Sequence, residues 1–168
     1  NVGMGVYALQ ASTGSYNIGI GFAAQYNANS GSYNVSLGDY TLVSGNGSYN
    51  VALGTNALRN VSTGSSNSVA VGASAGYAAT GANNIFLGYQ AGNNLTTGTN
   101  NIIIGYDIDA TSTTMTQGLN IGNLIFGTGL NGTGTTLSTG NIGIGTSTPA
   151  ARLAVVGVSG AGTDLFNI

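Results

Sequence analysis

Asn50-Val-Ala-Leu-Gly54 is the stretch of sequence that decides the fold, because the chain repeats its pattern along most of its length. The pattern is a small polar residue, an apolar residue, any residue, a second apolar residue and glycine. Its nine copies close at Gly5, Gly21, Gly38, Gly54, Gly72, Gly88, Gly105, Gly127 and Gly145. The spacing between successive closing glycines is nearly constant, except for the longer interval from Gly105 to Gly127. A nearly fixed period of this length predicts a solenoid in which each repeat forms one coil.

Each copy predicts the same local structure. Val51 and Leu53 are two residues apart, which places both on one face of a β-strand, and the Val and Ile common at these positions favour an extended backbone. The closing Gly54 can take the positive φ of a tight corner, and a small residue, here Ala57, follows three positions later. We expect a second short strand and a second glycine corner to complete the coil. Because one coil buries too little to be stable alone, stacked coils should join their apolar pairs into one continuous ladder.

The asparagines that open the strands are predicted to form a ladder of their own. In a parallel stack, equivalent residues lie above one another at about 4.8 Å, and stacked Asn side chains exchange amide hydrogen bonds. The ladder residues are Asn1, Asn17, Asn34, Asn50, Asn84 and Asn101. Stacking also explains why the chain has only two basic and four acidic residues, since a repeated charge would repel its own copies. The sequence therefore predicts an all-β fold, a parallel β-solenoid or β-roll of about nine coils of 16 to 18 residues.

The composition excludes most kinds of chemistry. Without His or Cys the chain lacks the usual zinc ligands and thiol redox centres, and without His or Lys it lacks the base of a catalytic triad. Two arginines, Arg59 and Arg152, cannot form the basic patch that nucleic acid requires, and no apolar run reaches the roughly twenty residues of a membrane span. Asp107 and Asp109 could ligate calcium, but a calcium site needs more oxygen ligands, so we interpret this stretch as a solvated loop. We predict no catalytic residue, no cofactor, no metal site, no nucleic-acid partner and no direct membrane insertion.

Three tyrosines precede strand-opening asparagines and are predicted to form a file along one edge of the roll. They are Tyr16, Tyr33 and Tyr49. Such a file can bind carbohydrate or protein through its amphipathic rings. It can equally pack on itself, which would stiffen the stack or seal a seam between chains. Both interpretations stay open, and the sequence favours self-packing.

The segment Asn67-Ser-Val-Ala-Val-Gly-Ala-Ser-Ala-Gly-Tyr-Ala-Ala-Thr-Gly81 resembles the head repeat of trimeric autotransporter adhesins of the YadA type. In that family, Ser-Val-Ala-Ile-Gly is followed by Ala three residues later and then by a further Gly. The resemblance covers about residues 1–105. It implies a left-handed parallel β-roll in a homotrimer, intertwined or side by side, that binds host surfaces. The coils here are two or three residues longer than the unit of that family.

A second resemblance is at least as close. The segments Ile85-Phe-Leu-Gly-Tyr-Gln-Ala-Gly-Asn-Asn-Leu-Thr-Thr-Gly98 and Asn141-Ile-Gly-Ile-Gly-Thr-Ser-Thr-Pro-Ala-Ala-Arg-Leu-Ala-Val-Val-Gly157 are similar to long bacterial repeat proteins and to phage tail-fibre-like proteins. Such proteins often end in an endosialidase-type intramolecular chaperone, which trimerises the fibre and then cuts itself off. The resemblance implies a chaperone of this kind downstream of these 168 residues.

Three regions follow from the spacing of the repeats. We expect regular β-roll repeats over residues 1–105, an irregular coil and transition over residues 106–140, and a connector or neck strand segment over residues 141–168. The long interval before Gly127 marks the transition, and Pro149 blocks ladder pairing at its own position.

These features predict a structural fibre segment of an extracellular surface appendage, on a cell surface or a virion. It would serve as a rigid spacer and as an adhesin-like attachment module. The alternative is a phage or phage-like tail fibre that binds a host surface. The expected partners are the chain itself, as a homotrimer or filament, and a host-surface protein or carbohydrate. A polysaccharide-processing enzyme would need a groove of clustered carboxylates, so we expect no enzyme. Because the sequence begins at Asn1, without an initiator methionine, we expect an excerpt or a processed product.

Overall fold

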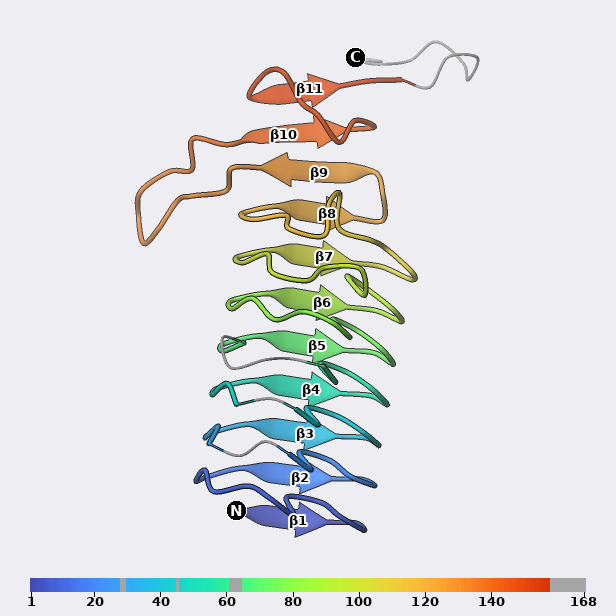
Figure 1. Ribbon diagram of the computed structural model, residues 1–168. Helices are drawn as coiled ribbons and strands as arrows, with labels where there is room; N and C mark the ends of the chain where they lie inside the picture. Colours follow the sequence, from blue (N-terminus) through green and yellow to red (C-terminus); the bar gives the residue numbers. More distant parts are fainter. Residues whose placement is uncertain (28–29, 45, 61–64, 158–168) are drawn as a thin grey trace.

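The computed structural model describes residues 1–27, 30–44, 46–60 and 65–157, which form one stack of short strands (Figure 1). The strands are β1 (Val2–Met4), β2 (Ile18–Ile20), β3 (Val35–Leu37), β4 (Val51–Leu53), β5 (Val69–Val71), β6 (Ile85–Leu87), β7 (Ile102–Ile104), β8 (Leu119–Ile121), β9 (Ile125–Thr128), β10 (Asn141–Ile144) and β11 (Leu153–Val155). All eleven belong to a single sheet and pair in sequence order. The described residues contain no helix, so the predicted all-β class is confirmed. The end of the predicted connector, residues 158–168, lies outside the described residues.

Strands β1 to β8 form a parallel ladder in which equivalent positions of each copy pair with one another. Val2 pairs with Ile18, and Ile18 pairs with Val35 in the next coil. The stack makes about seven turns. The predicted parallel β-solenoid is therefore confirmed, whereas the predicted number of nine coils is not.

The stack changes direction after β8. Strand β9 runs antiparallel to both β8 and β10, and β11 is parallel to β10. The eighth parallel copy is Gly118-Leu-Asn-Ile-Gly122, whose closing glycine follows Gly105 at the regular spacing of the repeat. The repeat pattern does not include this copy because Gly118 stands where the pattern has a polar residue. The predicted corner at Gly127 is wrong, since Gly127 lies inside β9. The parallel ladder thus extends beyond residue 105, the predicted end of the regular roll.

The second half of each coil, which we call the return leg, is not the strand that the sequence predicts. Residues two and four positions after the closing glycine have a left-handed backbone, for example Tyr40 (φ 56°) and Leu42 (φ 48°). The N–H of Tyr40 donates to Phe22 O in the preceding coil (2.8 Å). The N–H of Leu42 donates to Ala57 O in the following coil (3.2 Å). Left-handed backbone costs a non-glycine residue about 1–2 kcal/mol, so these bonds between coils maintain a conformation that the residue types alone disfavour.

The interior of the stack is narrow and lies between the strands and the return legs. Ala52 and Ala70, the middle residues of β4 and β5, are fully buried and share one cluster with Ala57 and Leu58 of a return leg. The apolar residues on either side of each middle residue point to the opposite face of the sheet, because side chains alternate along a strand. In β3, for example, the middle residue is buried and its two apolar neighbours are exposed. The predicted apolar ladder therefore exists, but it lies on the outside of the coil.

One interior layer has a large residue where the two preceding strands have alanine, and the following strand has Ile103. Phe86, the middle residue of β6, is fully buried at the position that alanine occupies in β4 and β5. The return legs beside it have Gly76 and Gly92 where an earlier coil has Leu58. A Cβ on Gly76 would lie 2.5 Å from Cδ2 of the phenyl ring, and a Cβ on Gly92 would overlap its other edge. The two glycines thus provide the space that the ring fills.

We predict that Phe86→Ala lowers the free energy of unfolding by about 3–5 kcal/mol, because it opens a cavity between two glycines. Gly76→Leu alone also destabilises the chain, since its side chain collides with the ring. The double variant Phe86→Ala/Gly76→Leu recreates the pairing of Leu58 with Ala70 found one coil earlier. Its free energy of unfolding should therefore fall by less than the sum of the two single decreases. Urea unfolding followed by circular dichroism measures all three. Additive losses would contradict this account of the interior.

Candidate functional site

The strand-opening asparagines connect each coil to the next, and those from Asn17 to Asn101 are buried. Oδ1 of Asn34 accepts a hydrogen bond from Asn50 N–H (2.9 Å), while its Nδ2 donates to Gly47 O (2.9 Å). Asn17 makes the same pair of bonds one coil earlier, to Asn34 N–H (2.9 Å) and Gly31 O (2.8 Å). Each side chain therefore joins two backbone groups of the following coil that are three residues apart.

The partners of this ladder differ from those that stacked amides would use. One bond between side-chain amides is present, from Asn101 Nδ2 to Asn84 Oδ1 (3.1 Å). The backbone bonds are more numerous because each Asn side chain spans the turn that opens the next strand. That turn contains a left-handed residue, such as Tyr49 (φ 62°). The Asn side chain supplies hydrogen-bond partners for backbone groups that would otherwise be buried and unpaired.

Two substitutions within the ladder show how it adapts and where it ends. Ser68 replaces one asparagine, and its Oγ accepts from Asn84 N–H (3.2 Å). The amide of Asn84 then bonds the turn of its own coil, at Gly81 O (3.1 Å). Gly118 donates its N–H to Asn101 Oδ1 (2.9 Å) but has no side chain to continue the ladder. The next strand pairing is antiparallel, so the ladder and the parallel stack end together.

The first seven predicted corner glycines have the positive φ that a corner requires, between 122° and 134°. They are Gly5, Gly21, Gly38, Gly54, Gly72, Gly88 and Gly105. They also touch the next coil: a Cβ on Gly38 would lie 2.8 Å from Gly54 C. Gly145 has a smaller positive φ of 72°, beyond the parallel ladder. A second file, which includes Gly14 and Gly31, leaves no room for a Cβ beside the carbonyl group of the next coil. Glycine thus leaves room for stacking at both ends of most coils, although Ser65 and Met115 occupy the position of the second file in two of them.

The file of Tyr16, Tyr33 and Tyr49 consists of stacked rings. The ring centroids are 4.8 Å and 5.0 Å apart, with interplanar angles of 14° and 2°. The rings cover one another's faces and remain about half exposed or more. Asn67 follows at the equivalent position of the next coil, where the file ends. Because the inner faces are occupied, this geometry favours self-packing over ligand binding.

The outward apolar pairs of β1 to β8 form a continuous surface, which we call the apolar sheet face. Its residues are Val2, Met4, Ile18, Ile20, Val35, Leu37, Val51, Leu53, Val69, Val71, Ile85, Leu87, Ile102, Ile104, Leu119 and Ile121. They form two straight files, since the strands pair in register. Several are strongly exposed in the single chain, for example Met4 (60%) and Leu37 (49%). No charged residue belongs to either file.

A second aromatic surface, which the repeat pattern does not predict, lies on the return legs. Its rings come from Tyr7, Phe22, Tyr26 and Tyr40. These residues occupy three different positions after the closing glycine, so a search at one fixed position does not bring them together. Stacking of the coils does, because neighbouring return legs are hydrogen-bonded side by side.

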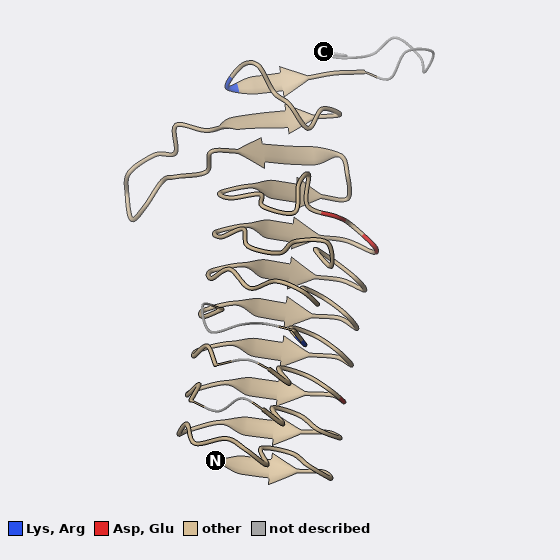
Figure 2. Cartoon of the chain, viewed as in Figure 1, with Lys and Arg blue, Asp and Glu red and all other residues tan. Residues whose placement is uncertain are grey.

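Charged side chains are few and scattered along the stack (Figure 2). The guanidinium of Arg59 lies over the ring of Tyr40, 4.7 Å from its centroid, and donates to Asn56 Oδ1 (3.0 Å). Oδ1 of Asp39 accepts from Phe22 N–H (2.7 Å). Among the described residues, no three potential metal ligands of the His, Cys, Asp or Glu type come together. The same residues include no helix that could cross a membrane.

Comparison with protein families, curated proteins and solved structures finds no match to the chain. The resemblances to trimeric adhesins and tail-fibre-like proteins therefore stay predictions from the repeat motif.

We predict that Asn34→Ala lowers the free energy of unfolding by about 2–6 kcal/mol, because it leaves one buried N–H and one buried C=O without a partner at about 1–3 kcal/mol each. Asn34→Ser should lose roughly half as much, since Ser68 shows that a hydroxyl can replace the acceptor. Urea unfolding compares the two variants with the unmodified chain. A loss below about 0.5 kcal/mol for Asn34→Ala, the size of an ordinary surface substitution, would contradict the bridging role.

Proposed function

We propose that this chain is a structural segment of an extracellular fibre, a rigid spacer that also takes part in surface attachment. The observation that carries the proposal is the apolar sheet face, which runs along the parallel stack and has no partner within the described chain. Contiguous exposed apolar surface of this extent is typical of protein–protein interfaces. The face suits an assembly in which several copies pack lengthwise.

Three sets of hydrogen bonds would make such a fibre stiff. The strands pair coil to coil, the return legs pair coil to coil, and the Asn side chains bond the turns between them. Each coil adds about 4.8 Å of length at the usual spacing between strands. Length is therefore set by the number of repeats, which is the property that a spacer needs.

The partner that fits the apolar sheet face best is another copy of the chain. The face is aliphatic, straight and free of charge, so two copies meet without burying unpaired charges. Its two files offer ridges that can interdigitate with the same ridges of a neighbour. The number of copies, three, is taken from the resemblance to trimeric adhesins.

The setting of the fibre is extracellular, on a cell surface or a virion. The same resemblances support this location. A phage or phage-like tail fibre is the alternative and has the same architecture. Immunogold electron microscopy of the native source separates the two settings and would contradict both if the chain were found inside cells.

We predict that the chain sediments as a trimer with about three times its mass of 16.5 kDa. Leu37→Lys should shift it to a monomer of unchanged circular dichroism, because one lysine in the middle of the face must be buried on assembly. Val6→Lys is the matched control, since Val6 is exposed but lies outside the two files. Analytical ultracentrifugation measures all three. A folded monomer at every concentration, or equal effects of both lysines, would contradict the proposed interface.

A further inference from the structure

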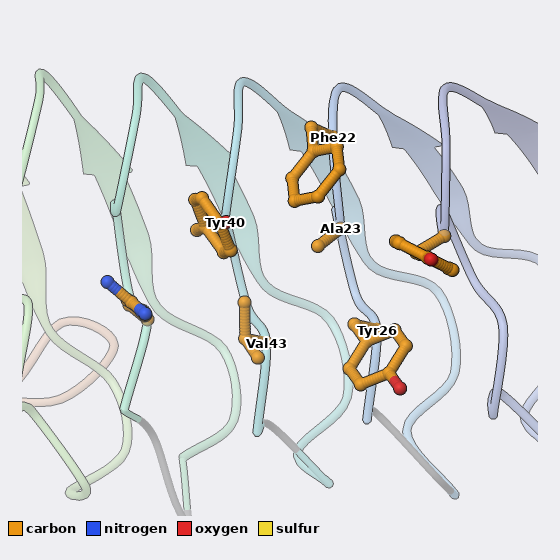
Figure 3. A pocket seen from close by; sticks show the side chains of 7 residues that line it. Phe22, Ala23, Tyr26, Tyr40 and Val43 are labelled. Atoms are coloured by element: carbon orange, nitrogen blue, oxygen red, sulfur yellow. The ribbon is translucent and has the colours of Figure 1, made fainter.

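The return leg has a groove lined mainly by aromatic side chains. Its rings belong to Tyr7, Phe22, Tyr26 and Tyr40, with buried Ala23 also lining it. Figure 3 shows three of these rings: Phe22 and Tyr26 project from one coil beside Ala23, and Tyr40 projects from the neighbouring coil. The cavity is open to solvent and has a volume of about 350 Å³, within the range of small-ligand sites.

The rings meet edge to face rather than in a stack. Tyr7 lies 5.7 Å from Phe22 at 80° and 5.8 Å from Tyr26 at 73°, and Phe22 lies 5.2 Å from Tyr40 at 66°. Edge-to-face contact covers less of the ring faces than the stacking of the Tyr16 file does, although Arg59 lies over one face of Tyr40. Tyr7 is 52% exposed. The groove therefore offers aromatic surface to a ligand.

A polar hollow lies on the return legs of the next two coils of the stack. It is lined by Ser74, Tyr77, Gln90 and Asn93 and has a volume of about 320 Å³. Ser74 and Gln90 are two residues after their closing glycines, which is the position of Tyr40 in its own coil. Tyr77 and Asn93 are five residues after theirs, which is the position of Arg59. Hydroxyl and amide groups both donate and accept hydrogen bonds. The two hollows together present apolar rings followed by neutral polar groups.

The backbone of the return leg restricts the kind of ligand. Its N–H and C=O groups bond the neighbouring coils, as those of Tyr40 and Leu42 do, so a peptide cannot add to this leg as an extra strand. Recognition must come from side chains. A ligand with apolar C–H faces and many hydroxyl groups matches rings and neutral polar groups, and a carbohydrate has both.

Arg59 adds a preference for negative charge. Its guanidinium has five N–H donors, and its contacts with Tyr40 and Asn56 fix its place at the end of the aromatic groove. A guanidinium held in this way suits a carboxylate, which it can bind through two parallel hydrogen bonds. We propose that the return-leg groove binds an oligosaccharide that carries carboxylate groups. The inference rests on the proposed attachment function and names the ligand class and the site.

Replacements for the test come from the repeat itself. Asn56 occupies the position of Tyr40 with the same left-handed backbone (φ 60°), and Asn93 occupies the position of both Tyr26 and Arg59. Two variants should therefore keep the fold: the double variant Tyr26→Asn/Tyr40→Asn and the single variant Arg59→Asn. Tyr106→Thr is the control, because Tyr106 is a highly exposed ring of the same leg outside the groove, and Thr55 occupies its equivalent position.

The experiment is calorimetric titration of the 168-residue chain with oligogalacturonate, a neutral galacto-oligosaccharide of equal length and a proline-rich peptide. We expect oligogalacturonate to bind about tenfold or more tightly than the neutral sugar, a difference of about 1.4 kcal/mol. The double tyrosine variant should bind both sugars about tenfold or more weakly. Arg59→Asn should lose only the preference for the acidic sugar. Tyr106→Thr should keep both the affinity and the preference.

Several results would overturn the inference: no binding of either sugar, binding that survives the double tyrosine variant, or binding of the proline-rich peptide in their place. Sedimentation of the same samples keeps the fibre proposal separate. A trimer that binds no sugar would refute the groove alone, whereas a monomer that binds sugar would refute the assembly alone.

Discussion

The structure depends on a hydrogen-bond bridge from each strand-opening asparagine to the backbone of the next coil. Asn34 joins the N–H of Asn50 and the carbonyl of Gly47 through one amide. These are the two ends of a turn whose middle includes a left-handed residue, and the amide pairs both with neutral partners. The bridge is made only if coils repeat in register, so it couples the local turn to the stacking of the whole solenoid.

That coupling constrains the rest of the chain. Each residue of the stack lies next to the equivalent residue of the neighbouring coil, and like charges at equivalent positions would repel each other, which explains the few charges. Glycine is needed where backbone meets backbone, as at Gly38 against Gly54. The interior is narrow enough that the ring of Phe86 requires glycines in the adjoining legs. The aliphatic residues on either side of each middle strand residue lie on the outer face of the sheet, where they form the apolar sheet face that we propose as the contact between copies.

The strands, their parallel register and the Asn and Gly files could be predicted because each leaves a periodic signal in the sequence. Other features leave none. Alternation alone could not predict that the apolar pairs lie on the outside of the coil, since it does not tell which face of a strand points inward. The return leg was wrongly predicted as a strand because Tyr40 and Leu42 have left-handed backbone that bonds between coils maintain. The end of the regular repeats was predicted too early because Gly118 departs from the pattern in the eighth copy, and the aromatic groove was not predicted because its rings occupy different positions in successive coils.

Native-state hydrogen exchange tests most directly whether the Asn bridge holds the coils together. The measured quantities are the exchange rates of the backbone amides of Asn34, Asn50 and Asn101, each bonded to the side chain of the preceding ladder residue. If the bridge is central, these amides exchange only through global unfolding, as slowly as those of the central strands. If they exchange as quickly as an exposed turn while the strands stay protected, the strands alone hold the stack and the account is wrong.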